Sequence, residues 1–251
     1  MTLAEALADQ ERAWRERPLL RRLYGDWYRM LAERLASVRG PTVELGSGIG
    51  AFKDVVPSAV TTDVEPTPWA DAVVDAEDLP YADGAVANLV LVDVFHHLGK
   101  PARFLDEAQR VLAAGGRLLV LDPYCSPVST PLYRRFHHER TDLGAPAFAD
   151  DPRAAAAPLD SNQARSTLVF FREADELARR WPELRVVERR RLAFLVYPLS
   201  GGYSKRPLVP AALYRPLRAF ETALRPLAPL AAFRCLVVLE RTAKEVAPGA
   251  S

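Results

Sequence analysis

The stretch VELGSGIG, residues 43–50, decides the fold of this 251-residue chain. It begins with a short apolar run of the kind that forms a buried strand, and glycines follow directly at Gly46, Gly48 and Gly50. Glycine lets the backbone turn with a positive φ and pass close to a ligand, toward which its amide N–H groups can point. The stretch therefore predicts a strand that ends in a ligand-binding turn, followed by a short helix.

Short apolar runs recur along the rest of the chain. Six more are strand-like: 59–62, 72–74, 87–92, 117–121, 186–197 and 233–241. The early runs are apolar throughout rather than alternating, which is typical of parallel strands buried on both faces. Helical segments such as 102–112 and 173–181 fall between some of them. This alternation predicts an α/β fold with a doubly wound, mostly parallel sheet of seven strands.

The N-terminal part predicts two helices. Thr2 and Glu5 form a capping box before the first helix. Pro18 separates it from a second run with apolar residues at helical spacing, and Gly40-Pro41 ends that run.

The chain divides into two parts by this pattern. We expect an N-terminal helical cap over residues 1–40 and one domain over residues 41–251, with insertions near 124–166 and 198–231. Both insertions are rich in proline and irregular. Irregular segments on a rigid sheet often shape a substrate site.

Three further segments follow the glycine stretch near the ends of predicted strands. They are DAEDLPYADG at 75–84, DVFHHL at 93–98 and RVLAAGG at 110–116. In addition, Asp63 follows the run 59–62, where a carboxylate can accept hydrogen bonds from both hydroxyls of a ribose.

In this order, the segments and the E-x-G-x-G-x-G pattern of residues 44–50 resemble the motifs of class I S-adenosylmethionine-dependent methyltransferases. A dinucleotide-binding fingerprint is also formally present at Gly46, Gly48 and Ala51, so a nicotinamide-dependent dehydrogenase is a competing interpretation. Segment 75–84 favours the methyltransferases. The resemblance implies a Rossmann-like sheet and S-adenosylmethionine as the cofactor.

The resemblance also implies which residues contact the cofactor: Glu44, Gly46, Ser47, Gly48, Gly50, Asp63, Val64, Asp75, Ala76 and Asp93. Glu44 would recognise the methionine ammonium, and the glycine turn would admit the methionine and the ribose. Asp63 would hold the ribose, with Glu65 as a rival, and Asp75 would accept from the adenine amino group. Val64, or alternatively Ala76 and Leu79, would flank the adenine ring.

Asp93 has two possible roles. It contacts the amino-acid end of the cofactor, or it caps the turn in which it lies.

The sequence departs from the family pattern after the glycine turn. Val56-Pro57 leaves little room for a full first helix, and Pro66-Thr67-Pro68-Trp69 replaces the usual second helix. We therefore expect a cofactor cleft that is more open on that side.

His97 is the candidate catalytic residue. It lies just past a strand end, where ligands bind in open α/β sheets, and an imidazole there can act as a general base for a hydroxyl. The alternative is a histidine that caps or packs the turn. His96 is a weaker candidate, because adjacent residues point in different directions.

The segment His137-His138-Glu139 contains three residues of types that bind metals, but adjacent histidines on a helix point about 100° apart. We therefore predict no bound metal there. Contact with a substrate by His137, Glu139 or Tyr133 is more plausible than a metal site, and the alternative is a plain surface or packing role.

Composition excludes several classes of protein. The chain has 33 basic and 32 acidic residues and a net charge of +1, without the basic excess of a nucleic-acid-binding protein. Two cysteines indicate a reducing, cytoplasmic setting, and neither a signal peptide nor a long apolar run is present. Peripheral membrane contact by the arginine-rich stretch 205–234 is an alternative to simple packing on the sheet. The sequence contains no signal for an oligomeric state.

The charge is unevenly distributed. Residues 41–110 hold 12 acids and 4 bases, a net charge of −8, whereas residues 181–251 hold 5 acids and 12 bases, a net charge of +7. An acidic half suits a cationic cofactor. The basic half predicts a small-molecule acceptor that is neutral or anionic.

The leading hypothesis is a methyltransferase acting on a small molecule, with O-methylation favoured because a base candidate exists. Two alternatives are an S-adenosylmethionine-binding enzyme of another reaction type and a non-catalytic partner protein that binds the cofactor.

Overall fold

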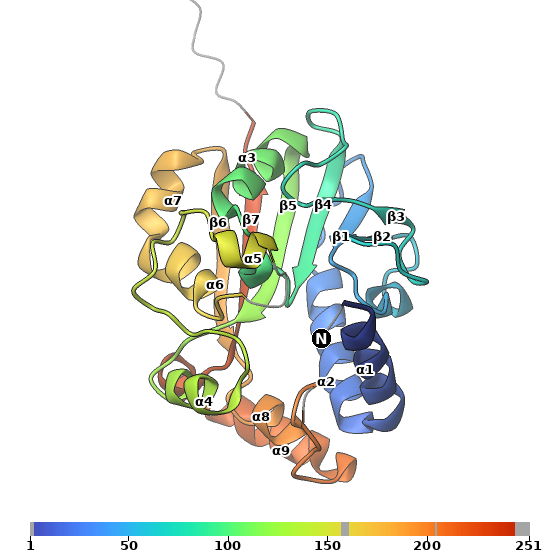
Figure 1. The fold of residues 1–251 in the computed structure, drawn as a ribbon, viewed down its shortest axis with the longest axis vertical. Coiled ribbons are helices and arrows are strands. Elements are labelled where there is room, and N and C mark those ends of the chain that lie inside the picture. Colours follow the sequence, from blue (N-terminus) through green and yellow to red (C-terminus); the bar gives the residue numbers. More distant parts are fainter. Residues whose placement is uncertain (1–2, 157–160, 204, 244–251) are drawn as a thin grey trace, which may run out of the picture.

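One seven-stranded sheet with helices on both faces forms the computed structural model, which describes residues 3–156, 161–203 and 205–243 (Figure 1). Its strands are β1 (Thr42–Leu45), β2 (Val60–Asp63), β3 (Ala72–Val73), β4 (Val86–Val92), β5 (Leu112–Pro123), β6 (Leu184–Leu192) and β7 (Arg234–Arg241). The strand order is β3-β2-β1-β4-β5-β7-β6, and β7 runs antiparallel to both of its neighbours. The predicted fold class, a mostly parallel, doubly wound sheet, is confirmed.

Helices connect and cover these strands. They are α1 (Leu3–Glu16), α2 (Pro18–Ala32), α3 (Pro101–Val111), α4 (Ser129–Phe136), α5 (Pro152–Ala156), α6 (Arg165–Thr167), α7 (Ala174–Arg180), α8 (Val196–Ser200), α9 (Tyr214–Ala223) and α10 (Ala228–Ala231). Single turns of other helix types lie at Ala51–Asp54, Phe95–His97, Leu168–Arg172, Ala211–Leu213 and Arg225–Leu227. Pro18 opens α2, where its missing N–H costs nothing. Thr2, the expected cap of α1, lies outside the described residues.

The two faces of the sheet carry separate apolar cores, because successive side chains of a strand point to opposite faces. In β4, Leu89 and Leu91 pack into the core that includes Phe104 of α3. Val90 between them packs into the core that includes Leu20 of α2. Burial on both faces explains why the runs that predicted strands are apolar throughout.

The strand expected at 186–197 is shorter and differently placed. β6 ends at Leu192, and Ala193 takes a φ of 58°, which a strand does not allow. The chain then enters α8. The apolar run therefore continues past the strand into a helix, which periodicity over so short a stretch does not distinguish.

The segment between β1 and β3 lacks full helices, as the prolines predict. Only one turn, Ala51–Asp54, follows the glycine stretch. We expected an open cleft here, but α1 lies beside the turn: a Cβ at Gly48 would meet the side-chain oxygen of Gln10 at 3.0 Å. Phe52 also packs against Tyr28 of α2, with ring centroids 5.7 Å apart.

The carboxyl ends of the strands face the irregular segments. In Figure 1 the arrowheads of β4 and β5 point toward the end of the molecule where α4, α8 and α9 lie. No helix in the described part of the chain is long and apolar enough to span a membrane.

Candidate functional site

The glycine turn after β1 has the backbone that its sequence predicts. Gly46, Gly48 and Gly50 take φ values of 65°, 55° and 68°, the left-handed region that favours glycine. A Cβ at Gly46 would lie 2.6 Å from a methyl carbon of Val94. The turn after β4, which contains Val94, therefore packs directly on the glycine turn.

Two buried polar groups beside this turn have no hydrogen-bond partner among the described residues. They are one carboxylate oxygen of Glu44 and the hydroxyl of Ser47. Burial, and then the nearby charge of Asp63, raise the pKa of Glu44 well above its usual range. A buried carboxylate without a partner is costly and fits a cationic ligand, such as the ammonium of S-adenosylmethionine. The residues present at the turn thus fit the implied cofactor.

Asp63 ends β2 and faces the glycine turn. Its carboxylate accepts hydrogen bonds from the N–H of Gly48 at 3.1 Å and of Val64 at 2.9 Å. Burial raises its pKa, although these backbone hydrogen bonds oppose the shift. The rival Glu65 is exposed, and so is the side chain of Val64.

Asp75 lies two residues beyond β3. β2 and β3 pair with Asp63 opposite Val73, so the carboxyl ends of both strands lie at one edge of the sheet. The exposed Asp75 accepts a hydrogen bond from the N–H of Glu77 at 2.8 Å, and Ala76 is partly buried against the core. Three carboxylates, counting Glu44 within β1, therefore lie at or just past the carboxyl ends of three adjacent strands.

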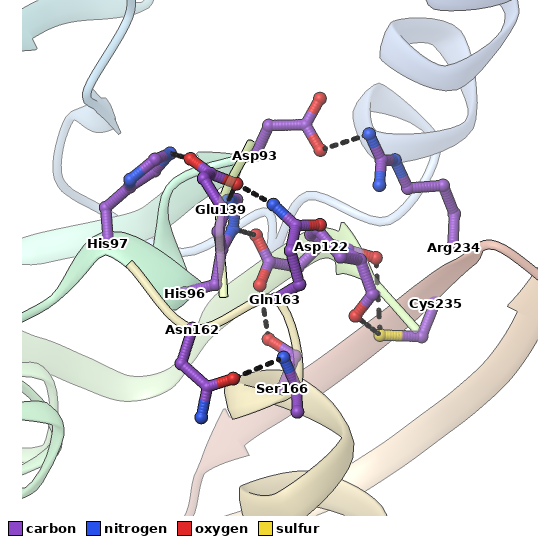
Figure 2. A network of polar contacts seen from close by, with 12 residues as sticks. Asp93, His96, His97, Asp122, Glu139, Asn162, Gln163, Ser166, Arg234 and Cys235 are labelled. Carbon is purple, nitrogen blue, oxygen red and sulfur yellow. Dashed lines mark hydrogen bonds and ion pairs between the residues drawn. The ribbon is translucent and has the colours of Figure 1, made fainter. Parts of the chain in front are cut away.

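Asp93 directly follows β4 with a φ of 57°, a strained conformation for a residue other than glycine. Arg234 of β7 forms an ion pair with the Asp93 carboxylate at 3.2 Å (Figure 2). The hydroxyl of Tyr24 donates to the same carboxylate at 2.6 Å. Arg234 is buried and also donates to the hydroxyl of Tyr197 at 2.5 Å. These contacts link Asp93 to α2 and β7 rather than to its own turn.

His96, His97 and Glu139 gather in a group that we call the histidine–carboxylate cluster (Figure 2). Nε2 of His96 lies 3.5 Å from one oxygen of Glu139, and Nε2 of His97 lies 3.6 Å from the other. Glu139 and His96 are buried, whereas the side chain of His97 is 24% exposed. Only His97 of the two histidines is accessible to an acceptor.

The structure differs here from the expectation that His96 and His97 point apart. Their ring centroids are 4.0 Å apart, and each Nε2 faces one oxygen of the same carboxylate. His96 is held by Asp122 of β5, whose carboxylate lies 2.9 Å from Nδ1. Burial lowers the pKa of His96, but Asp122 and Glu139 more than offset this and raise it to about 10.

Residues 137–139 also differ from the expectation. α4 ends at Phe136 and His137 has an extended backbone, so the helical angle between adjacent histidines does not apply. The rings of His137 and His138 stack with centroids 4.7 Å apart, and Nδ1 of His137 lies 3.5 Å from Glu139. Burial, the main cause, lowers the pKa of His137 to about 4. All four histidines of the chain thus surround Glu139.

Tyr133, the other residue expected to contact a substrate, is buried and donates to the carbonyl of Phe233 at 2.5 Å. It therefore packs inside the fold.

Sequence reasoning missed four residues of the site: Asp122, Gln163, Ser166 and Arg234. Ser166 donates to Asp122 at 2.5 Å, and the amide of Gln163 donates to Glu139. Asp122 lies near the carboxyl end of a strand, and the same kind of position made His97 a candidate, so this signal could also have identified Asp122. Gln163 and Ser166 lie in an irregular segment without a pattern to mark them.

Comparisons with known proteins agree with this architecture. Residues 43–120 match a family model described as a methyltransferase domain. A methyltransferase from Archaeoglobus fulgidus that depends on S-adenosylmethionine has a TM-score of 0.56 at 10% identity, covering 88% of this chain and 94% of that chain. No curated protein matches the chain.

Two further solved structures share the fold. The complex of the Trm112 methyltransferase activator with a methyltransferase from Haloferax volcanii gives a TM-score of 0.54 at 16% identity, and the match covers 97% of each chain. Geranyl diphosphate C-methyltransferase from Streptomyces coelicolor A3(2), solved with Mg²⁺, geranyl diphosphate and S-adenosyl-L-homocysteine, gives 0.52 at 17% identity, covering 89% of this chain and 81% of that chain.

Proposed function

We propose that this chain, which belongs to the class I S-adenosylmethionine-dependent methyltransferases, methylates a hydroxyl group of a small-molecule acceptor that is neutral or anionic. The observation that carries the proposal is the position of the histidine–carboxylate cluster next to the glycine turn. Val94, between the two, packs on Gly46, and His97 follows only three residues later.

The row of carboxylates on β1, β2 and β3 supports the cofactor assignment. Glu44 binds the methionine ammonium, and the glycine turn with Ser47 encloses the amino-acid part. Asp63 holds the ribose and Asp75 the adenine, with Val64 and Ala76 beside the ring. Asp93, fixed by Tyr24 and Arg234, stiffens the turn and borders the amino-acid end.

The cofactor supplies a methyl group that is already activated by its sulfonium. The chain must therefore position the acceptor oxygen, exclude water and remove a proton. His97 is the group that promotes loss of this proton, because it alone of the cluster histidines is partly exposed. Glu139 stabilises the charge that develops on its imidazole.

The elements around the carboxyl ends of the strands enclose the acceptor. α1 and α2, the helical cap of residues 1–40, contribute Gln10 beside the glycine turn and Tyr24 beside Asp93. The segment 124–166 supplies Glu139, and the segment 198–231 supplies the helix α9 and the end of α8.

The test is a screen for methylated products. Purified full-length chain receives S-adenosylmethionine labelled with ¹³C in its methyl group, together with small-molecule extracts. We expect S-adenosyl-L-homocysteine to form in step with a labelled methoxy group, identified by mass spectrometry and ¹³C NMR. A labelled methyl on carbon or nitrogen would contradict the hydroxyl acceptor, and a failure to bind the cofactor would contradict the whole proposal.

A further inference from the structure

We propose that His96, His97 and Glu139 bind a divalent cation of the zinc class, which holds the acceptor oxygen beside the cofactor. The site draws on two parts of the chain: the turn after β4 carries both histidines, and the segment after α4 carries Glu139. Each residue offers one ligand atom, and these atoms all lie within 4.8 Å of one another.

The spacing of the ligand atoms is the first argument. The nitrogen–oxygen distances of 3.5 and 3.6 Å are too long for good hydrogen bonds. Two ligands that are each about 2.1 Å from a tetrahedral zinc ion stand about 3.4 Å apart. Each histidine nitrogen thus lies at about this separation from one oxygen of Glu139, the two nitrogens facing different oxygens, and one ligand atom from each residue lies within 4.8 Å of the others.

The surroundings of the ligands are the second argument. A histidine that binds a metal through one nitrogen usually donates its other N–H to a carboxylate, which fixes the ring. Nδ1 of His96 lies 2.9 Å from Asp122, and Asp122 is in turn held by Ser166 at 2.5 Å (Figure 2). Nε2 of His96 therefore points to Glu139, and the amide of Gln163 donates to the same carboxylate oxygen.

Charge is the third argument. Asp122 and Glu139 are both buried, and in the described part of the chain their ion pairs are with histidines alone, without lysine or arginine. A divalent cation would neutralise this buried acidity.

The ligand types select the class of ion. Two imidazoles and one carboxylate, with a further position left for water or substrate, are the ligands of a catalytic zinc site. Magnesium and calcium prefer oxygen ligands, so this set favours zinc or a neighbouring transition metal. Because His97 is the exposed member, the remaining position faces the acceptor side.

The role of the cation in catalysis rests on the proposed function, whereas its binding does not. An acceptor hydroxyl beside the cation loses its proton to solvent water more easily, because the ion lowers its pKa. The oxygen then forms the bond to the methyl carbon, and the electron pair of the carbon–sulfur bond leaves with sulfur. His97 is then a ligand, and direct proton transfer to it is not needed.

The experiment is a titration of the full-length chain, stripped with a chelator, with ZnCl₂ by calorimetry and with CoCl₂ by visible absorption. We expect one ion per chain and the intense cobalt bands of a site with four or five ligands. His97→Gln should weaken zinc binding by at least about 100-fold, and Asp122→Asn by about 10- to 100-fold. His138→Gln, the same change at an exposed neighbour, should leave it within threefold.

The outcomes separate the two proposals. Absence of stoichiometric binding, or binding lost in His138→Gln but kept in His97→Gln, would overturn the metal site. Methyl transfer that a chelator abolishes and zinc restores supports both proposals. Transfer that is unaffected by the chelator overturns the metal site and leaves His97 as the base. Zinc binding without any methylated product sustains the site and contradicts the proposed function.

Discussion

At the scale of single residues, the burial of the Glu44 carboxylate costs stability, and a bound ammonium group would reduce this cost. Its carboxylate is buried, lacks a partner on one oxygen among the described residues and faces the charge of Asp63. The ionised form is therefore disfavoured in the free protein. An ammonium at this position would reverse the preference.

Glu44→Gln should separate these effects. We expect the substitution to weaken S-adenosylmethionine binding by roughly 10- to 100-fold, because a charged hydrogen bond is lost. It should also raise the melting temperature of the cofactor-free protein at neutral pH. Calorimetric titration and thermal unfolding measure the two quantities, with exposed Glu65→Gln as the control. Equal effects of both substitutions would argue against Glu44 as the ammonium ligand.

The raised pKa of Glu44 also sets a direction for pH. Above this pKa the carboxylate is charged and can pair with the ammonium of the cofactor. As the pH falls through it, Glu44 becomes neutral, and the affinity for S-adenosylmethionine should decline. In Glu44→Gln this part of the pH dependence should be absent, as measured by cofactor titrations across pH.

A substitution at Gly46 tests whether stability depends on the close contact between the glycine turn and the turn after β4. Gly46→Ala places a Cβ 2.6 Å from Val94 at a positive φ, so we expect a loss of about 2–4 kcal/mol in the free energy of unfolding. Gly25→Ala within α2 has no such contact and should stabilise the protein by up to about 1 kcal/mol. Denaturant unfolding measures both values, and a harmless Gly46→Ala would contradict the contact.

At the scale of elements, sequence patterns predicted the site where it lies on regular strands. Glu44 lies in β1, Asp63 ends β2 and His97 lies in the turn after β4, and parallel strands bring such ends to one edge. The patterns failed where the backbone leaves regular structure. His137 lies past the end of α4, so a helical angle gave the wrong geometry for its neighbour.

The link between α2 and the turn after β4 depends on one hydrogen bond. Tyr24→Phe removes the donor to Asp93 and should cost about 1.5–3 kcal/mol, because the acceptor is a carboxylate in a partly buried position. Tyr28→Phe, one helical turn along, should cost less, since the structure gives its hydroxyl no hydrogen bond among the described residues. Thermal or denaturant unfolding of the two variants checks the difference, and equal losses would contradict the link.

At the scale of the whole molecule, the fold was predictable because its central strands, such as β4 and β5, are buried on both faces and leave a clear apolar pattern. The contacts of Arg234 were not predictable from the sequence. Arg234 reaches Asp93 because the strand order places β7 next to β5, and β5 lies beside β4. Likewise, Glu139 joins His96 and His97 across more than forty residues, which include α3, β5 and α4. Such long-range pairings carry no local signal, although they complete the site.

The central claim is that methyl transfer takes place at the histidine–carboxylate cluster, next to the glycine turn. The most direct measurement compares single-turnover methyl transfer with S-adenosylmethionine affinity in wild type, His97→Gln and His138→Gln. We predict that His97→Gln slows transfer by about 100-fold or more while it binds the cofactor as wild type does, and that His138→Gln changes neither quantity. Transfer by His97→Gln at the wild-type rate would contradict the account.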